Sequence, residues 1–201
     1  MKKNIIIILD PAHGANVKGK CSPDMKHREY KWSRERVRNL SAMLMHLGYV
    51  VYTTTTSENE PGLSKRRNFA TQVAKGYKKL LISLHNNAAG DGKSWMNARG
   101  VEVYTTPGIT KADMCADYLL SQFKTDFPEI KLRYNKDAKL ERDKEASFSV
   151  LLGADYMGVL VEWLFQDNKD DVELLMDADM NSRFESSIVD AVEAINDYFK
   201  T

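Results

Sequence analysis

The stretch IIIILDPAHG at residues 5–14 decides the fold that we expect for this chain. Its five consecutive aliphatic side chains, at residues 5–9, are typical of a strand that is buried on both faces, as in a parallel sheet. The run is shorter than the apolar core of a signal peptide, and it ends in Asp10 and Pro11 without a cleavage site of small residues. We therefore interpret it as the first strand of a buried sheet.

Similar apolar runs recur along the chain and alternate with helical patterns. Further strands are predicted at residues 49–54, 80–84, 101–104 and 159–162. Helical spacing of apolar residues predicts helices at 29–47, 63–77 and 110–123, and a last helix with Phe184, Ile188, Val192, Ile195 and Phe199 on one face. This alternation predicts a single α/β domain over residues 1–201, with helices on both faces of a mostly parallel sheet. The polar stretch at 131–147 is expected to be a solvated loop or helix face, with a substrate-contacting element as the alternative.

The composition argues against several classes of protein. The chain has 201 residues, of which 43% are hydrophobic and 28% are charged, and its formal net charge is +1. This balance gives no general attraction to nucleic acid or to an anionic membrane. No apolar run approaches the ~20 residues that a membrane span requires. Two cysteines, Cys21 and Cys115, do not make a disulfide framework, and the sequence leaves open whether they pair.

Polar side chains lie at the ends of three predicted strands. His13 follows the first strand, His85 follows the strand at 80–84, and Glu162 closes the strand at 159–162. Ligands of open α/β sheets bind outside the carboxyl ends of strands, where these three side chains are expected to meet. A carboxylate that ends so apolar a run is costly to bury unless it is paired or used. The pattern fits a metal or catalytic site and fits structural roles for these residues equally well, and it does not decide which residue would bind and which would react.

Other polar and aromatic residues have structural explanations beside functional ones. Glu29 lies at the start of a predicted helix, where the helix dipole favours an acidic residue. His27 is expected to be a solvated surface residue, with a place among the ligands as the alternative. His46 lies in the last turn of the same helix, where a cation is favoured. Core or rim packing is expected for Trp32, Trp95 and Trp163, with stacking on sugar or peptide as the alternative.

The chain resembles the zinc-dependent N-acetylmuramoyl-L-alanine amidases of the amidase-3 type, found in bacterial cell-wall hydrolases and phage endolysins. The resemblance rests on DPAHG at 10–14, Glu29, SLHNNA at 83–88, GVEVY at 100–104 and VLVEWLFQDN at 159–168. These segments follow the family's order and span most of the chain. The resemblance implies a three-layer α/β/α fold with a central sheet of about six strands. It also implies hydrolysis of the amide between N-acetylmuramic acid and L-alanine in peptidoglycan, which releases stem peptides.

The resemblance also implies roles for individual residues. It makes His13, Glu29 and His85 the ligands of one Zn²⁺ ion. It makes Glu162 the catalytic residue that moves protons, and Asn87 a residue that supports the site. Glu29 enters the ligand set only through the resemblance, because its position in the pattern is equally that of a helix-start carboxylate.

Two positions depart from the family's usual pattern. Ala12 and Leu164 stand where glycine is common in the family. Neither change removes a ligand. We expect Leu164 to change the shape of the pocket beside Glu162, and with it the preferred stem peptide.

Other functions are compatible with parts of this pattern. A zinc peptidase or deacetylase would cut cell-wall material at another bond, and a non-catalytic wall-binding protein could share the fold. Retention of all four site residues argues against the second, and a nucleotide-binding module would need a glycine-rich motif that the chain lacks after its first strand. Peptidoglycan is the expected partner. The chain is expected to be a monomer. Without a visible signal peptide, the chain is expected to be made in the cytoplasm and to act at the cell wall.

Overall fold

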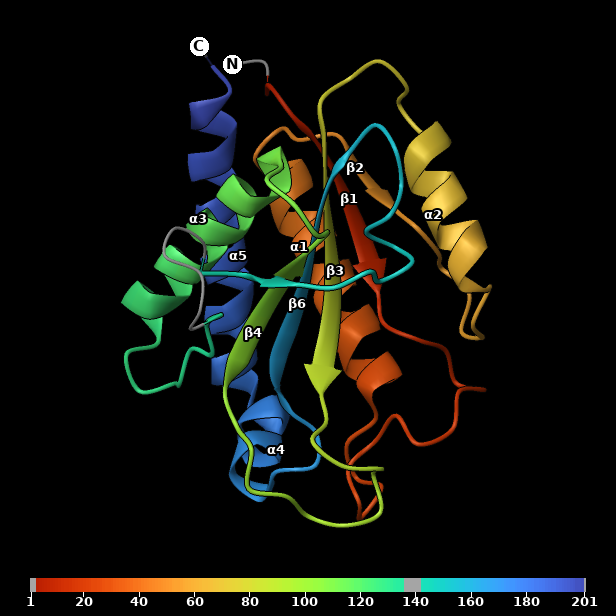
Figure 1. The fold of residues 1–201 in the computed structure, drawn as a ribbon, viewed down its shortest axis with the longest axis vertical. Helices are drawn as coiled ribbons and strands as arrows, with labels where there is room; N and C mark the ends of the chain where they lie inside the picture. Colours follow the sequence, from red (N-terminus) through yellow and green to blue (C-terminus); the bar gives the residue numbers. More distant parts are fainter. Residues whose placement is uncertain (1–2, 136–141, 201) are drawn as a thin grey trace.

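A computed structural model of the chain describes residues 3–135 and 142–200 (Figure 1). A six-stranded sheet in the order β2-β1-β3-β6-β4-β5 forms its centre. Strand β4 runs antiparallel to β6, and the other neighbouring strands are parallel. The strands are β1 (Ile6–Pro11), β2 (Val51–Thr53), β3 (Lys79–Asn87), β4 (Val101–Thr105), β5 (Lys144–Glu145) and β6 (Met157–Phe165).

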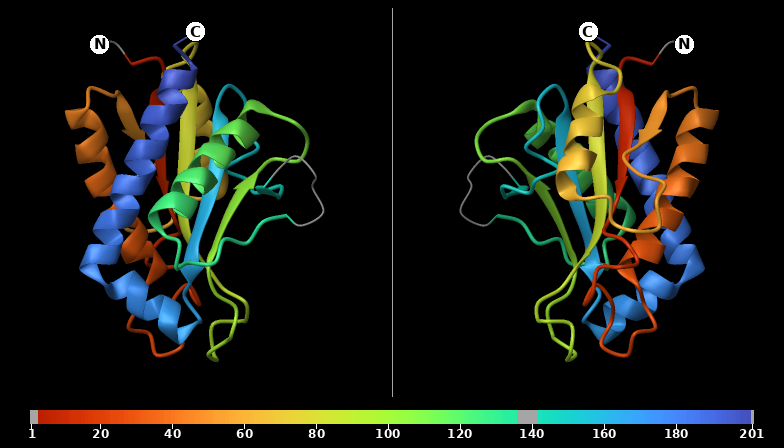
Figure 2. Two further views of the ribbon diagram at one scale, coloured as in Figure 1. Left: turned by 90° about the vertical axis from the view of Figure 1, so that its left-hand side faces the viewer. Right: turned by 90° about the vertical axis from the view of Figure 1, so that its right-hand side faces the viewer.

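Helices cover both faces of this sheet unequally. The helices are α1 (Glu29–His46), α2 (Leu63–Gln72), α3 (Lys111–Asp126), α4 (Lys169–Met176) and α5 (Ala178–Tyr198). Helices α1, α3 and α5 lie together on one face, as Figure 2 shows, and enclose the larger core. Helix α2 and residues 148–152 cover the other face over a smaller cluster of apolar side chains. The predicted α/β fold with a mostly parallel sheet of six strands is confirmed.

Alternation along β3 explains why the functional side chains face the thinner layer. Leu80, Ile82 and Leu84 belong to the large core, whereas Leu81 belongs to the cluster beneath α2. Successive side chains of a strand point to opposite faces. His85 therefore lies on the same face as Leu81, beyond the point at which the smaller cluster ends. The carboxyl end of β3 thus carries a polar residue where the apolar cover stops.

Several boundaries differ from those that periodicity predicts. Helix α2 ends at Gln72 rather than at residue 77, because the chain turns through Ala74 and Gly76, both with positive φ. Helix α4 is too short, at eight residues, to show a clear helical period in the sequence. Strand β5 lies inside the stretch 131–147 that was expected to be a solvated loop, and residues 136–141 of that stretch lie outside the described residues.

Two further features of the structure concern the cysteines and membrane-spanning helices. Cys21 and Cys115 are both free thiols, so the question of their pairing is answered. Among the described residues, no helix has the length and apolar character that crossing a membrane requires.

Candidate metal centre and active site

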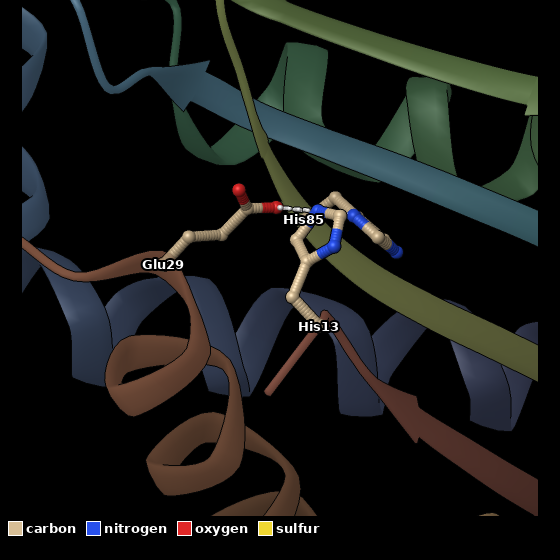
Figure 3. A group of neighbouring side chains, drawn as sticks. All are labelled: His13, Glu29 and His85. Carbon is tan, nitrogen blue, oxygen red and sulfur yellow. Dashed lines mark hydrogen bonds and ion pairs between the residues drawn. The ribbon is translucent and has the colours of Figure 1, made fainter. Parts of the chain in front are cut away.

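The three predicted ligands converge at the carboxyl edge of the sheet (Figure 3). His13 follows β1, Glu29 is the first residue of α1, and His85 lies near the end of β3. Glu29 Oε1 lies 3.0 Å from His85 Nδ1 and 3.4 Å from His13 Nε2. One candidate ligand atom from each residue can be chosen so that all three lie within 4.8 Å of one another. Three segments that are distant in the sequence therefore present their donor atoms to one point.

The spacing and chemistry of these atoms fit a zinc ion. Zinc binds imidazole nitrogen and carboxylate oxygen at about 2.0–2.2 Å in a tetrahedral arrangement, which places neighbouring ligand atoms about 3.4 Å apart. Glu29 is buried, and the side chains of His13 and His85 keep 21% and 15% of their exposure. Burial opposes ionisation of Glu29, but its contacts with the two histidines outweigh this effect and lower its pKa well below the usual range. The centre thus combines an ionised carboxylate with two accessible imidazoles.

Hydrogen bonds from two other segments fix the Glu29 carboxylate. Its Oε1 accepts from the backbone N–H of Asn86 at 3.1 Å, and its Oε2 accepts from Gln166 Nε2 at 2.9 Å. Gln166 follows β6 directly and also donates to the carbonyl of Asn86. Such supporting bonds orient the ligands of a metal site. Sequence reasoning missed Gln166 and Asn86, although both lie inside segments that carry the family resemblance.

Two arginines hold the backbone that presents His13. The φ of His13 is 46°, in the left-handed region that costs a residue with a side chain about 1 kcal/mol. Arg34 Nη2 donates to the His13 carbonyl at 2.8 Å, and Arg66 Nη2 donates to the same oxygen at 2.9 Å. Arg66 also pairs with the buried Asp10 at 2.8 Å and with Glu60 at 2.8 Å. The Asp of DPAHG is thus an anchor beneath the first histidine.

Removing the buried Arg66 tests this anchor. We expect Arg66→Met to lower the free energy of unfolding by about 3 kcal/mol, because the Asp10 carboxylate is left buried without its cation. Urea unfolding measures the change. Lys65→Met, at the exposed neighbouring position, is the matched control, with a change below about 0.5 kcal/mol. Equal stability of the two variants would show that the pair beneath His13 does not hold the loop.

Glu162 lies next to His85 on the neighbouring strand. The two residues are paired in the parallel register of β3 and β6, so their side chains lie on the same face of the sheet. Glu162 Oε2 is buried and has no hydrogen-bond partner among the described residues. Burial raises the pKa of Glu162 to about 7, with His85 opposing and Glu29 supporting the rise. A carboxyl with this pKa exchanges protons near neutral pH, as a general acid–base must.

Comparison of the sequence with models of known protein families identifies the family of this chain. A family described as N-acetylmuramoyl-L-alanine amidase, Amidase_3, matches residues 7–194. The chain belongs to this amidase family. It is an enzyme that hydrolyses amide bonds of peptidoglycan. A search of curated proteins found no match.

Solved amidase structures share the fold of this enzyme. A structure of N-acetylmuramoyl-L-alanine amidase from Clostridium difficile 630 matches with a TM-score of 0.81 and 21% identity, covering 96% of this chain and 98% of that chain. The amidase Ami1 from Mycobacterium smegmatis matches with a TM-score of 0.79 and 17% identity, covering 98% of each chain. The catalytic domain of the CD27L endolysin, which targets Clostridia difficile, matches at 0.63 and 20% identity, covering 94% and 97%.

The structure links Asn87 to the strand beside Glu162 in this amidase. Asn87 Nδ2 donates to Glu102 Oε2 at 2.8 Å, and Glu102 is paired with Glu162 across β4 and β6. Glu102 also forms ion pairs with Arg133 at 2.7 Å and Lys144 at 2.6 Å. Parts of the stretch 131–147 therefore contact this carboxylate, which corrects the expectation of a solvated loop. These contacts form because Glu102 is buried and needs cationic partners.

The expectation of a solvated His27 is wrong. His27 retains 4% of its exposure, and its Nε2 lies 2.8 Å from Asn86 Oδ1. Residues before α1 fold back on themselves, since the His27 N–H donates to Ser22 Oγ at 3.0 Å. Burial lowers the pKa of His27, so the ring is favoured in its neutral form and supports Asn86 behind the amidase site. His46, by contrast, is exposed in the last turn of α1, as expected.

Leu164 lies in a backbone conformation that favours glycine. Between the pairs His85–Glu162 and Asn87–Phe165, β6 has one residue more than β3, which makes a β-bulge. Leu164 lies in this bulge with φ 61°, a conformation that favours glycine. Its side chain is fully buried in the large core. The expectation that Leu164 reshapes the pocket is therefore corrected: the strain at this position is offset by core packing.

This bulge predicts an unusual order of stability. Alanine normally exceeds glycine by about 0.5–1 kcal/mol within a strand. We expect Leu164→Gly to be at least as stable as Leu164→Ala, with both losing about 3 kcal/mol of core packing. Leu160, buried earlier in the same strand, should show the normal order in the matched pair of substitutions. If urea unfolding finds the normal order at both positions, the left-handed conformation of Leu164 is refuted.

Proposed function

We propose that this amidase uses one Zn²⁺ ion bound by His13, Glu29 and His85, and that Glu162 transfers the protons of the reaction. The convergence of the three donor groups at one point, with a carboxyl group beside them, supports this proposal most strongly. Two imidazoles and one carboxylate are a ligand set typical of catalytic zinc, which keeps a further position for water or substrate. Glu162 is not one of the three proposed ligands, so its carboxyl group is free to transfer protons.

The residues of the proposed site have distinct tasks in the reaction. When bound, zinc polarises the scissile carbonyl and lowers the pKa of water toward ~7. Glu162 accepts a proton from the attacking water as the new C–O bond forms. It then delivers that proton to the leaving nitrogen as the C–N bond breaks. Gln166 and Asn86 hold Glu29 in place throughout.

The proposed substrate bond is the amide that joins the lactyl group of N-acetylmuramic acid to L-alanine. The family's description supports this bond. We also propose that residues 1–201 act as a single catalytic domain at the cell wall. A zinc peptidase or a deacetylase would use similar ligands, so the products of the reaction distinguish the three activities.

Digestion of purified peptidoglycan tests the proposed bond. Mass spectrometry should find intact stem peptides that begin with free L-alanine, and glycan whose muramic acid carries a free lactyl carboxylate. Stem peptides cut internally would indicate a peptidase, and loss of acetyl groups would indicate a deacetylase. Either of these results without free N-terminal L-alanine would overturn the proposal.

A further inference from the structure

A pocket lies between the segment that joins β3 to β4 and the start of α4. Its volume is about 340 Å³, and it is lined by Trp95, Met96, Asn97, Asn168, Lys169 and Asp170. Its walls come from the segment between β3 and β4 and from the start of α4, which lie side by side in both views of the fold (Figure 1). Trp32 and Trp163 are buried in the core, whereas Trp95 is only half-buried.

A short turn after β6 joins this pocket to the metal centre. The side chain of Gln166 holds Glu29, as described above. The next residue, Asp167, holds the β3–β4 segment: its Oδ2 accepts from the backbone N–H groups of Ala89 and Gly90, each at 2.8 Å. Its backbone carbonyl accepts from the N–H of Met96 at 2.7 Å. Two consecutive residues thus fix a candidate ligand and the pocket wall.

Hydrogen bonds within the chain hold the pocket walls together. Asn168 Nδ2 donates to the carbonyl of Met96 at 3.1 Å, and Asn168 Oδ1 accepts from the N–H of Asp171 at the start of α4. The residues on both sides of the pocket are therefore tied together next to Trp95. A preformed wall lowers the entropic cost of binding. Trp95 is held in this segment with part of its ring exposed, and that part can contact a ligand.

The charges around the pocket favour a neutral ligand. Lys169 Nζ lies 5.8 Å from the centre of the Trp95 ring, and Asp170 is paired with Arg99 at 2.8 Å. Arg99 also pairs with Asp171 at 3.2 Å, so the two cations Lys169 and Arg99 are balanced by Asp170 and Asp171 and leave little net charge to attract an anionic polymer or a peptide carboxylate. The exposed amide of Asn97 adds a neutral donor and acceptor.

We propose that this pocket binds the glycan strand of peptidoglycan, with a sugar ring stacked on Trp95. A pyranose ring presents a face of C–H bonds to an aromatic ring, while its hydroxyl and acetamido groups at the edge need polar partners. Trp95 supplies the apolar surface, and Asn97 and Asp170 supply the partners. This inference rests on the proposed function only because that function names peptidoglycan as the substrate. The pocket would hold the glycan strand while the amide between the lactyl group and L-alanine lies at the metal centre.

Binding to glycan strands from which the stem peptides have been removed tests the proposal without any hydrolysis. We expect Trp95→Ala to weaken this binding about tenfold, within the range for loss of one stacked ring, and Asn97→Ala to weaken it less. Trp95→Phe keeps a ring and should retain most of the affinity. Tyr77→Ala removes an exposed aromatic side chain near the opposite end of β3 and should change nothing.

Two results would overturn the glycan pocket: no binding of stem-free glycan by the wild-type protein, or equal binding by the wild-type protein and Trp95→Ala. Urea unfolding of Trp95→Ala shows whether its fold is intact. If it is not, glycan binding by Trp95→Phe and Asn97→Ala tests the pocket instead. Release of stem peptides is measured separately. Glycan binding through Trp95 without release of stem peptides would support the glycan pocket and contradict the proposed substrate bond. Release of stem peptides without such binding would support the substrate bond and contradict the glycan pocket.

Discussion

Glu162→Ala and Glu162→Gln should each lower the rate of stem-peptide release about a thousandfold and leave the fold intact. General acid–base catalysis by a placed side chain contributes about 10²–10⁴ to a rate, and neither alanine nor glutamine can accept the proton of water. The free energy of unfolding should not fall. A carboxyl whose pKa is raised in the folded state destabilises that state once it ionises, so removing it relieves a cost.

Kinetics on peptidoglycan and urea unfolding at pH 8 measure both effects. Glu173→Gln, an exposed acid on α4, is the matched control and should behave as the wild-type protein does. Wild-type rates in Glu162→Gln would exclude proton transfer by this side chain. Loss of both activity and stability would indicate a structural role for Glu162 instead.

We expect His85→Ala to lose the bound zinc and, with it, hydrolysis. His85 contributes one of the three converging donor groups, and a site with two remaining donors holds zinc far more weakly. Elemental analysis of the purified protein should find about one zinc ion in the wild-type protein and none in the variant. His46→Ala, at an exposed position on α1, keeps the metal and the activity.

Glu29→Gln asks whether the third donor must be a carboxylate. The substitution keeps the shape of the side chain but removes the charge that lies 3.0 Å from His85 Nδ1. We expect its zinc content to fall as well. Full zinc occupancy in both Glu29→Gln and His85→Ala would place the metal elsewhere in the protein.

Part of the candidate site follows from the sequence because strands have a simple pattern. Continuous aliphatic runs locate β1, β3 and β6, although each strand continues two or three residues beyond its run. Parallel strands present their carboxyl ends at one edge. His13, His85 and Glu162 can therefore be placed together from the sequence alone. The pattern does not assign their roles, because binding and proton transfer use the same residue types.

Glu29 and its supports could not be found in this way. The segment before α1 folds back so that the Glu29 N–H donates to the carbonyl of Lys20, a contact that no periodicity encodes. The same fold buries His27, which the sequence placed at the surface. Gln166 reaches Glu29 from beyond a β-bulge in β6, and bulges leave no regular signal in hydrophobicity.

We propose that hydrolysis depends on one zinc ion held by His13, Glu29 and His85. The most direct test of this proposal is to remove metal from the wild-type protein with a chelator and to follow stem-peptide release while zinc is returned stepwise. We expect no release from the metal-free protein and a rise in rate that is complete at one zinc ion per chain. Full activity in the metal-free protein would contradict it.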